Sequence, residues 1–164
     1  MPQLGALGVL SVIVDVSTYL PSTPEEIEQH VKTSRLLMYV ASPIIKFIPF
    51  GAAQLPEVWG KGTYWVVLRL FGFLPLGKQA VVISYPDIPE GFSIRDNGHS
   101  MLIRKWDHRI TVERSGVGAL YRDHVVIEAG VFTIFVWAFA QLFYRHRQRR
   151  WRKLVANGFS FAAT

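Results

Sequence analysis

The beginning of the chain alternates between apolar and polar residues with a period of two. Four aliphatic residues between Gly8 and Thr18 would share one face: Leu10, Val12, Val14 and Val16. Successive side chains of a strand point to opposite faces, so the pattern predicts a half-buried strand. The apolar run from Leu4 lacks a positively charged leader and a small-residue cleavage site, so we interpret it as part of the strand and not as a signal peptide.

Two short helices are expected next. Ser22 or Thr23 can accept hydrogen bonds from the free backbone N–H groups at a helix start, and the first helix should run to about Lys32. A second helix is expected from Ser34 to Ala41, because Pro43 discourages its continuation. Residues 43–62 then contain three prolines and several glycines, which favour an ordered loop. Apolar residues in this loop should pack at the rim of the core: Ile44, Ile45, Phe47, Ile48 and Phe50.

From Gly62 onward, β-branched and aromatic residues predict a run of antiparallel strands joined by short turns. The expected strands are Thr63–Phe73, Lys78–Tyr85, Phe92–Arg95, Met101–Glu113 and Gly118–Ala129. The expected turns between them include Leu74–Gly77, Asp96–Gly98 and Arg114–Gly116.

The last part of the chain changes to helical spacing after Gly130. Large apolar residues recur there every three or four positions: Phe132, Phe135, Val136, Phe139 and Phe143. They predict a helix from about Val131 to Asn157, with 158–164 as a tail. Its first half is apolar nearly all round, so we expect more than one cover for it. The sheet would supply one cover, and residues 43–50, a second subunit or a ligand the other. A sheet closed by one long helix is an α+β fold.

Charge is concentrated in this helix. Arg145–Lys153 carries six bases, which equals the formal net charge of +6, and the remaining twelve bases match twelve acids. Three interpretations stay open: a solvated helix end, contact with an anionic membrane, or a nucleic-acid patch, which the neutral remainder disfavours. The absence of cysteine excludes disulfides and thiolate metal sites and agrees with a cytoplasmic location. No spacing of His, Asp and Glu matches a metal site.

Three runs carry a family resemblance. They are Trp106-Asp107-His108-Arg109-Ile110-Thr111-Val112, Tyr121-Arg122-Asp123-His124-Val125 and Phe143-Tyr144-Arg145-His146-Arg147. With the element order, they resemble bacterial proteins of the START-like, or SRPBCC, superfamily, above all those described as ligand-binding SRPBCC or polyketide cyclase/dehydrase-like. The resemblance implies one domain over residues 1–164 with a β-α-α-β(6)-α helix-grip fold. In that fold, a curved antiparallel sheet of about seven strands grips the C-terminal helix around a deep cavity. The resemblance implies a lipid, polyketide or other apolar ligand, and it carries over no catalytic motif and no cofactor.

Strand alternation selects the polar residues that could face this cavity. One face of Met101–Glu113 carries Arg104, Trp106 and His108, while the other is more polar, so these three are expected to point inward. In the last strand, Tyr121 and Asp123 are the inward candidates, and His108 could approach either across the strand pair. On the helix, the cavity wall is expected from Phe135, Val136 and Phe139.

Three interpretations of the polar cluster stay open. It could orient a ligand by hydrogen bonds. It could also act as an aromatase/cyclase-type site, with His108 as general base, Asp123 orienting it, and Tyr121 or Arg104 stabilising an enolate. Alternatively, it could be an internal His–Asp pair that ties two strands together, because unpaired buried polar groups are costly. The functional hypotheses are therefore a non-catalytic carrier or sensor of an apolar molecule, an enzyme, or a homodimeric interaction protein.

Overall fold

The computed structural model describes residues 3–4 and 10–161. The strands are β1 (Gln3–Leu4), β2 (Leu10–Leu20), β3 (Ile45–Pro49), β4 (Gly62–Leu70), β5 (Leu74–Ser84), β6 (Phe92–Ser100), β7 (Lys105–Ser115) and β8 (Gly118–Glu128). The helices are α1 (Pro24–Val31), α2 (Ser34–Ala41), the short 3₁₀ helix η1 (Gly130–Phe132) and α3 (Thr133–Ala156). The first residues of the expected N-terminal strand, Gly8 and Val9, lie outside the described residues.

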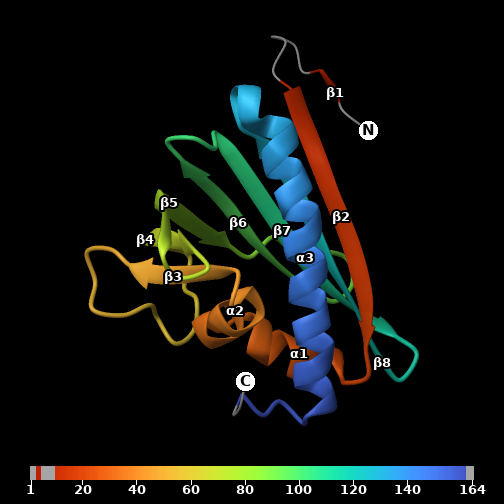
Figure 1. Cartoon of the computed structure of the whole chain (residues 1–164). Coiled ribbons are helices and arrows are strands. Elements are labelled where there is room, and N and C mark those ends of the chain that lie inside the picture. The colour runs from red at the N-terminus through yellow and green to blue at the C-terminus, as the bar shows by residue number, and fades with distance from the viewer. Residues whose placement is uncertain (1–2, 5–9, 162–164) are drawn as a thin grey trace.

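The strands form one antiparallel sheet in the order β1-β2-β8-β7-β6-β5-β4-β3. The sheet curves around α3, and α1 and α2 lie near the C-terminal end of that helix (Figure 1). This is the predicted α+β helix-grip fold, which is confirmed. The two-residue β1 adds one edge strand to the seven expected. No helix within the described ranges has the length and apolar composition needed to cross a membrane.

The two short helices begin where the sequence predicts. Thr23 Oγ1 accepts a hydrogen bond from the Glu26 N–H group at 3.3 Å, and Thr33 Oγ1 accepts one from the Leu36 N–H group at 3.1 Å. Each bond satisfies one of the backbone donors that a helix start leaves free. The two helices bury their apolar sides in the core below the cavity: Ile27, Val31, Leu36 and Val40.

The predicted loop over residues 43–62 is wrong in its first part. Residues Ile45–Pro49 form β3, which pairs with β4 and places Phe47 opposite Leu68. The strand lies at the edge of the sheet, where Pro49 can be accommodated because an edge strand leaves N–H groups without a ladder partner. The many prolines and glycines hid this strand, since they are typical of loops.

Two predicted turns lie elsewhere. The β4–β5 turn is Phe71–Phe73 and not Leu74–Gly77, and Gly72 adopts the left-handed conformation with φ of 80°. The predicted turn at Asp96–Gly98 is part of β6. The chain reverses instead at residues 101–104, so β7 begins at Lys105 and not at Met101.

The Asp96–Gly98 segment is an irregular stretch of strand. Asp96 Oδ1 accepts a hydrogen bond from the Val82 N–H group at 2.8 Å, so a side chain takes the place of a ladder carbonyl. A Cβ atom at Gly98 would lie 2.8 Å from the Ala80 carbonyl oxygen, which explains the glycine. Asp96 and Gly98 are residue types that are common in turns, but here they allow β5 and β6 to approach closely and do not reverse the chain.

Candidate functional site

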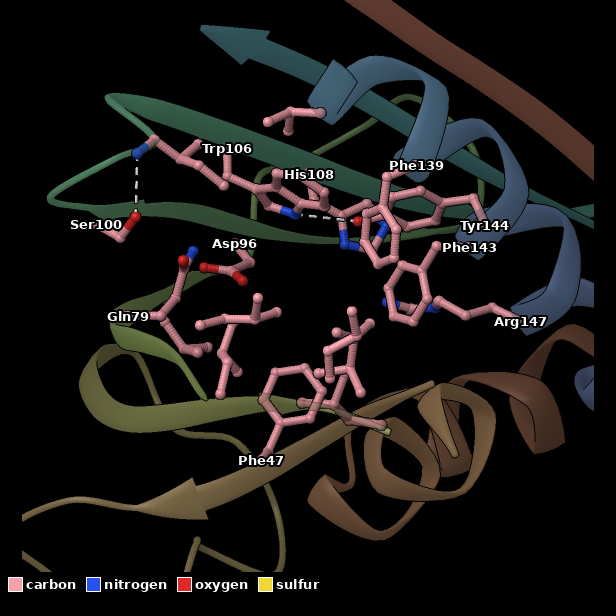
Figure 2. Close-up of a pocket in the computed structure, with 18 of the residues that line it drawn as sticks. Phe47, Gln79, Asp96, Ser100, Trp106, His108, Phe139, Phe143, Tyr144 and Arg147 are labelled. Atoms are coloured by element: carbon pink, nitrogen blue, oxygen red, sulfur yellow. Dashed lines mark hydrogen bonds between the residues drawn. The ribbon is translucent and has the colours of Figure 1, made fainter. Parts of the chain in front are cut away.

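A cavity of about 450 Å³ lies between the sheet, the short helices and α3. Its size falls within the range of roughly 300–1,000 Å³ that is typical of small-molecule sites. Most of its wall is apolar and includes Phe47, Trp59, Val81, Ile83, Ile94 and Phe143. Figure 2 shows that polar side chains from β5, β6, β7 and α3 also face it.

One end of the cavity is bordered by exposed apolar side chains. Leu76 of β5, Leu102 of the β6–β7 turn, Phe132 of η1 and Phe135 of α3 all line the cavity and are all exposed. Ile94, deeper in the wall, is buried. The cavity therefore has a mouth between the start of α3 and the two hairpins, and a closed floor near α1 and α2.

The apolar residues expected to form the helix side of the site line the cavity: Phe135, Val136 and Phe139. Trp106 lines it from β7, and its Nε1–H group donates a hydrogen bond to the Tyr144 hydroxyl at 3.1 Å. Residues 43–50 supply part of the expected second cover, because Ile44, Ile45 and Phe47 belong to the same apolar cluster as Ala140 and Phe143. Phe135 and Leu142 stay 76% and 71% exposed.

The polar cluster predicted on β7 and β8 comes together. His108 Nε2 lies 2.8 Å from Asp123 Oδ1, and Asp123 is fully buried. The Tyr121 hydroxyl donates to the same oxygen at 3.1 Å, and Gln148 Nε2 of α3 donates to Oδ2 at 3.0 Å. Both oxygens of this carboxylate therefore have hydrogen-bond donors, and the cluster joins the sheet to the helix.

Burial, hydrogen bonds and the charge of Arg147 together set the protonation of His108 and Asp123. Burial lowers the pKa of His108 more than the hydrogen bond to Asp123 raises it, so His108 is neutral. Burial also raises the pKa of Asp123, but the His108 hydrogen bond and the positive charge of Arg147 bring the pKa below its ordinary value. A neutral imidazole that faces an ionised carboxylate carries its proton on the facing nitrogen, so Nε2 donates.

The structure divides the predicted polar residues into two groups. His108 lines the cavity, whereas Tyr121 and Asp123 are buried between β8 and α3 and contact Trp151 and Gln148 there. The inward placement of Arg104 is wrong. It is exposed in the β6–β7 turn, because β7 starts one residue later and the alternation that placed Arg104 does not extend to it.

The polar cavity residues that the sequence did not predict include Gln79, Asp96, Ser100 and Arg147. Asp96 was assigned to a turn, yet it lies directly opposite His108 in the β6–β7 pairing. Burial raises the pKa of Asp96 to about 7, against the effects of the Val82 N–H group and the Arg147 charge. Arg147 follows Phe143 by four residues, so the apolar stripe of the helix could have indicated that it faces inward.

The expectation that the basic segment projects into solvent is wrong in part. Arg147 is 6% exposed and lies over the Tyr144 ring, with Cζ 5.1 Å from the ring centroid. Arg150 Nε donates to the Tyr39 carbonyl oxygen at 2.7 Å, and Arg152 donates to Thr18 Oγ1 at 2.9 Å. These arginines join the second half of α3 to α2 and β2, so charge alone does not predict exposure here.

Solved structures share this architecture over nearly the whole chain. A START superfamily protein from Mycobacterium smegmatis is 12% identical, with 88% of this chain and 97% of that chain covered and a TM-score of 0.59. A norcoclaurine synthase point mutant from Thalictrum flavum, in complex with a transition state analogue, is 8% identical, with 94% and 99% covered and a TM-score of 0.64. The Aha1 dimer from Colwellia psychrerythraea is 13% identical, with 88% and 96% covered and a TM-score of 0.58.

Identities this low show the fold alone. These structures confirm that the chain has the START-like fold that the resemblance in its sequence implied. Residues 20–155 match the family model described as "Domain of unknown function (DUF8410)", and the chain belongs to that family. No curated protein matches the sequence.

Proposed function

We propose that this protein binds a hydrophobic small molecule, lipid-like or polyketide-like, in the cavity between the sheet and α3, and that it acts as a non-catalytic carrier or sensor. The observation that carries the proposal is the cavity itself: about 450 Å³, mainly apolar, with a buried floor and an exposed mouth. An apolar wall with a few polar groups on one side is the usual composition of a site that binds and orients such a ligand.

The direct test is binding of the uncharged apolar dye Nile red, followed by fluorescence, together with native mass spectrometry of the gently purified protein. A Val81→Phe/Ile94→Phe double variant fills the cavity, because both side chains are buried in its wall. Val117→Phe is the matched control, since Val117 is 90% exposed in the β7–β8 turn. We expect the double variant to lose dye binding and the control to keep it. Unchanged binding by a folded double variant would contradict the proposal.

An aromatase/cyclase-type enzyme is a second candidate, and the His108–Asp123 pair at the cavity wall favours it. The norcoclaurine synthase structure, which holds a transition state analogue, shares the fold. His108→Gln separates the two functions. An enzyme would retain one molecule in the wild type and its unconverted substrate in the variant, as read by native mass spectrometry. A carrier would retain the same molecule in both.

A homodimer is the third candidate, because Val131, Ile134 and Phe135 expose apolar side chains at the start of α3. The Aha1 structure with the same fold is a dimer. Light scattering of the wild type and of an Ile134→Ser/Phe135→Ser variant tests this candidate. A dimer that becomes a monomer in the variant would support it, and a wild-type monomer at high concentration would exclude it.

A further inference from the structure

We propose that the inner end of the cavity recognises a carboxylate, and that Arg147 is the residue that binds it. The ligand class is then an amphiphile with one carboxylate head and an apolar tail. This inference rests on the proposed binding function and names the substrate class of the same cavity.

Arg147 is the starting point because its charge is buried and its Nε–H group has no hydrogen-bond partner. The side chain lines the cavity, and Figure 2 shows its nitrogen atoms beside Phe143 at the cavity edge. Its Nε is buried without a hydrogen-bond partner, and a hydrogen bond with the Tyr121 hydroxyl helps to raise the pKa of the guanidinium. Among residues 3–4 and 10–161, no carboxylate forms an ion pair with it. A buried N–H donor without an acceptor is costly, and a carboxylate matches the planar set of donors of a guanidinium.

Asp123 does not fill this role. Its carboxylate already accepts hydrogen bonds from His108, Tyr121 and Gln148, at 2.8, 3.1 and 3.0 Å. Asp123 therefore offsets the charge of Arg147 through the electric field, and each group influences the pKa of the other. Asp123 thus offsets the buried charge of Arg147 while the Nε–H group stays available to a ligand.

The surrounding polar groups suit an anionic head. The charge of Arg147 acts on Asp96, which lies opposite His108 on the cavity side of β6. Because the pKa of Asp96 is raised to about 7, a large fraction of this carboxyl is uncharged near neutral pH. A protonated Asp96 can donate a hydrogen bond to a neighbouring carboxylate instead of repelling it.

The helix sets the direction of the bound molecule. Arg147 follows Phe135 at the mouth by twelve residues, a distance of about 18 Å along the helix axis. Phe139 and Phe143 lie between them and stack with ring centroids 5.6 Å apart. A carboxylate on Arg147 would therefore leave its tail against this apolar row, with the far end towards the mouth.

The test compares tetradecanoic acid with tetradecanol, which differ only in the head group. Displacement of Nile red, itself uncharged, is measured at about pH 6, above the ordinary pKa of a carboxyl group and below the raised pKa of Asp96. The variants are Arg147→Met, which removes the charge at similar length, and Arg149→Met, a matched change at an exposed position of the same helix. We expect Arg147→Met to weaken binding of the acid by about ten- to a hundredfold and to leave the alcohol unchanged. Arg149→Met should change neither.

An unchanged ratio of acid to alcohol affinity in folded Arg147→Met would overturn the proposal. If that variant does not fold, the proposal is tested with the wild type alone, by comparing how tightly tetradecanoic acid, tetradecanol and tetradecylamine bind. Tightest binding of the acid and weakest binding of the amine supports the proposal, and any other order overturns it. Binding of Nile red and the alcohol without preference for the acid leaves the cavity function intact, whereas failure of every probe in the wild type rejects that function too.

Discussion

The two halves of α3 reverse the expectation that their compositions create. The first half is apolar, yet Phe135 is 76% exposed and Leu142 is 71% exposed. The second half carries the basic run, yet Arg147 is 6% exposed and Trp151 is 1% exposed. The start of α3 borders the mouth of the cavity, while α3 packs along β2, and α1 and α2 lie near its C-terminal end (Figure 1). Both halves also contain residues of the other kind, such as buried Phe143 and exposed Arg149, so the position of a side chain in the fold, and not its hydrophobicity, decides whether it is buried.

This difference predicts that some changes in α3 affect the free energy of unfolding and that others affect ligand entry. The second half of α3 belongs to a continuous core with polar cross-links, so changes there should lower the free energy of unfolding. The exposed side chains at the start of α3, such as Phe135, contribute little buried surface, so changes there should affect ligand entry more than stability. Substitution of a buried residue and of a matched exposed one tests this contrast between stability and ligand entry.

The largest effect is expected at Asp123. Asp123→Ala removes the acceptor shared by His108, Tyr121 and Gln148 and leaves three buried donors without it. Loss of one partner from a buried charged cluster costs about 3–5 kcal/mol. Urea unfolding followed by circular dichroism measures the loss.

Asp15→Ala is the control for this change. Asp15 of β2 pairs with Arg122 and His124 of β8, the strand that carries Asp123, but the groups are partly exposed. Exposed ion pairs contribute about 0.2–1 kcal/mol, so the control should lose less than the buried variant. Equal losses would mean that the buried cluster does not stabilise the junction between sheet and helix.

The next effect compares two phenylalanines of α3. Phe143 is 4% exposed, and its replacement by alanine should cost about 3 kcal/mol through lost burial and a new cavity. Phe135→Ala should cost less than about 0.5 kcal/mol, because its side chain is mostly exposed. Thermal unfolding of both variants checks this contrast. Similar losses would show that the mouth is as tightly packed as the floor.

Much of this arrangement was readable from the sequence. Period-two alternation placed Trp106 and His108 on the cavity side of β7, and helical periodicity placed Phe139 on the cavity side of α3. Both patterns are local, and one buried face imposes each of them.

The errors arise where tertiary contacts override local preference. Asp96 and Gly98 are typical turn residues, and only the close approach of β5 gives them a place within a strand. Arg147 was assigned to solvent because it belongs to a basic run, although its spacing from Phe143 puts it on the buried face. The positive charge favoured an exposed position for Arg147, whereas its four-residue spacing from Phe143 correctly indicates a buried one.

A smaller effect is expected from pH at Asp96. The folded protein holds this proton up to a pKa of about 7, whereas the unfolded chain releases it near the ordinary value of 3.8. The folded state therefore binds more protons between these values, and the contribution of Asp96 to stability falls as pH rises. Because Asp96 is only partly buried, we expect a loss of about 2 kcal/mol, less than the full pKa difference implies.

Asp96→Asn isolates this contribution, because an amide oxygen can still accept the hydrogen bond from the Val82 N–H group. Urea unfolding of both proteins at about pH 4.5 and about pH 8 gives the comparison. The wild type should lose stability relative to the variant at the higher pH. The opposite sign would mean that the Asp96 carboxyl is more acidic in the folded protein than in the unfolded chain.

The smallest effect tests whether the basic half of α3 is structural. Arg150 donates from Nε to the Tyr39 carbonyl oxygen at 2.7 Å, and its Cζ lies 4.2 Å from the Tyr39 ring centroid. Arg150→Ala should cost about 1 kcal/mol, because it removes one partly buried hydrogen bond and this cation–π contact. Arg149→Ala, at an exposed position of the same run, should change the free energy of unfolding by less than about 0.5 kcal/mol. Equal values for the two would leave the arginine run without a structural role, and its charge would then have to act on something outside this chain.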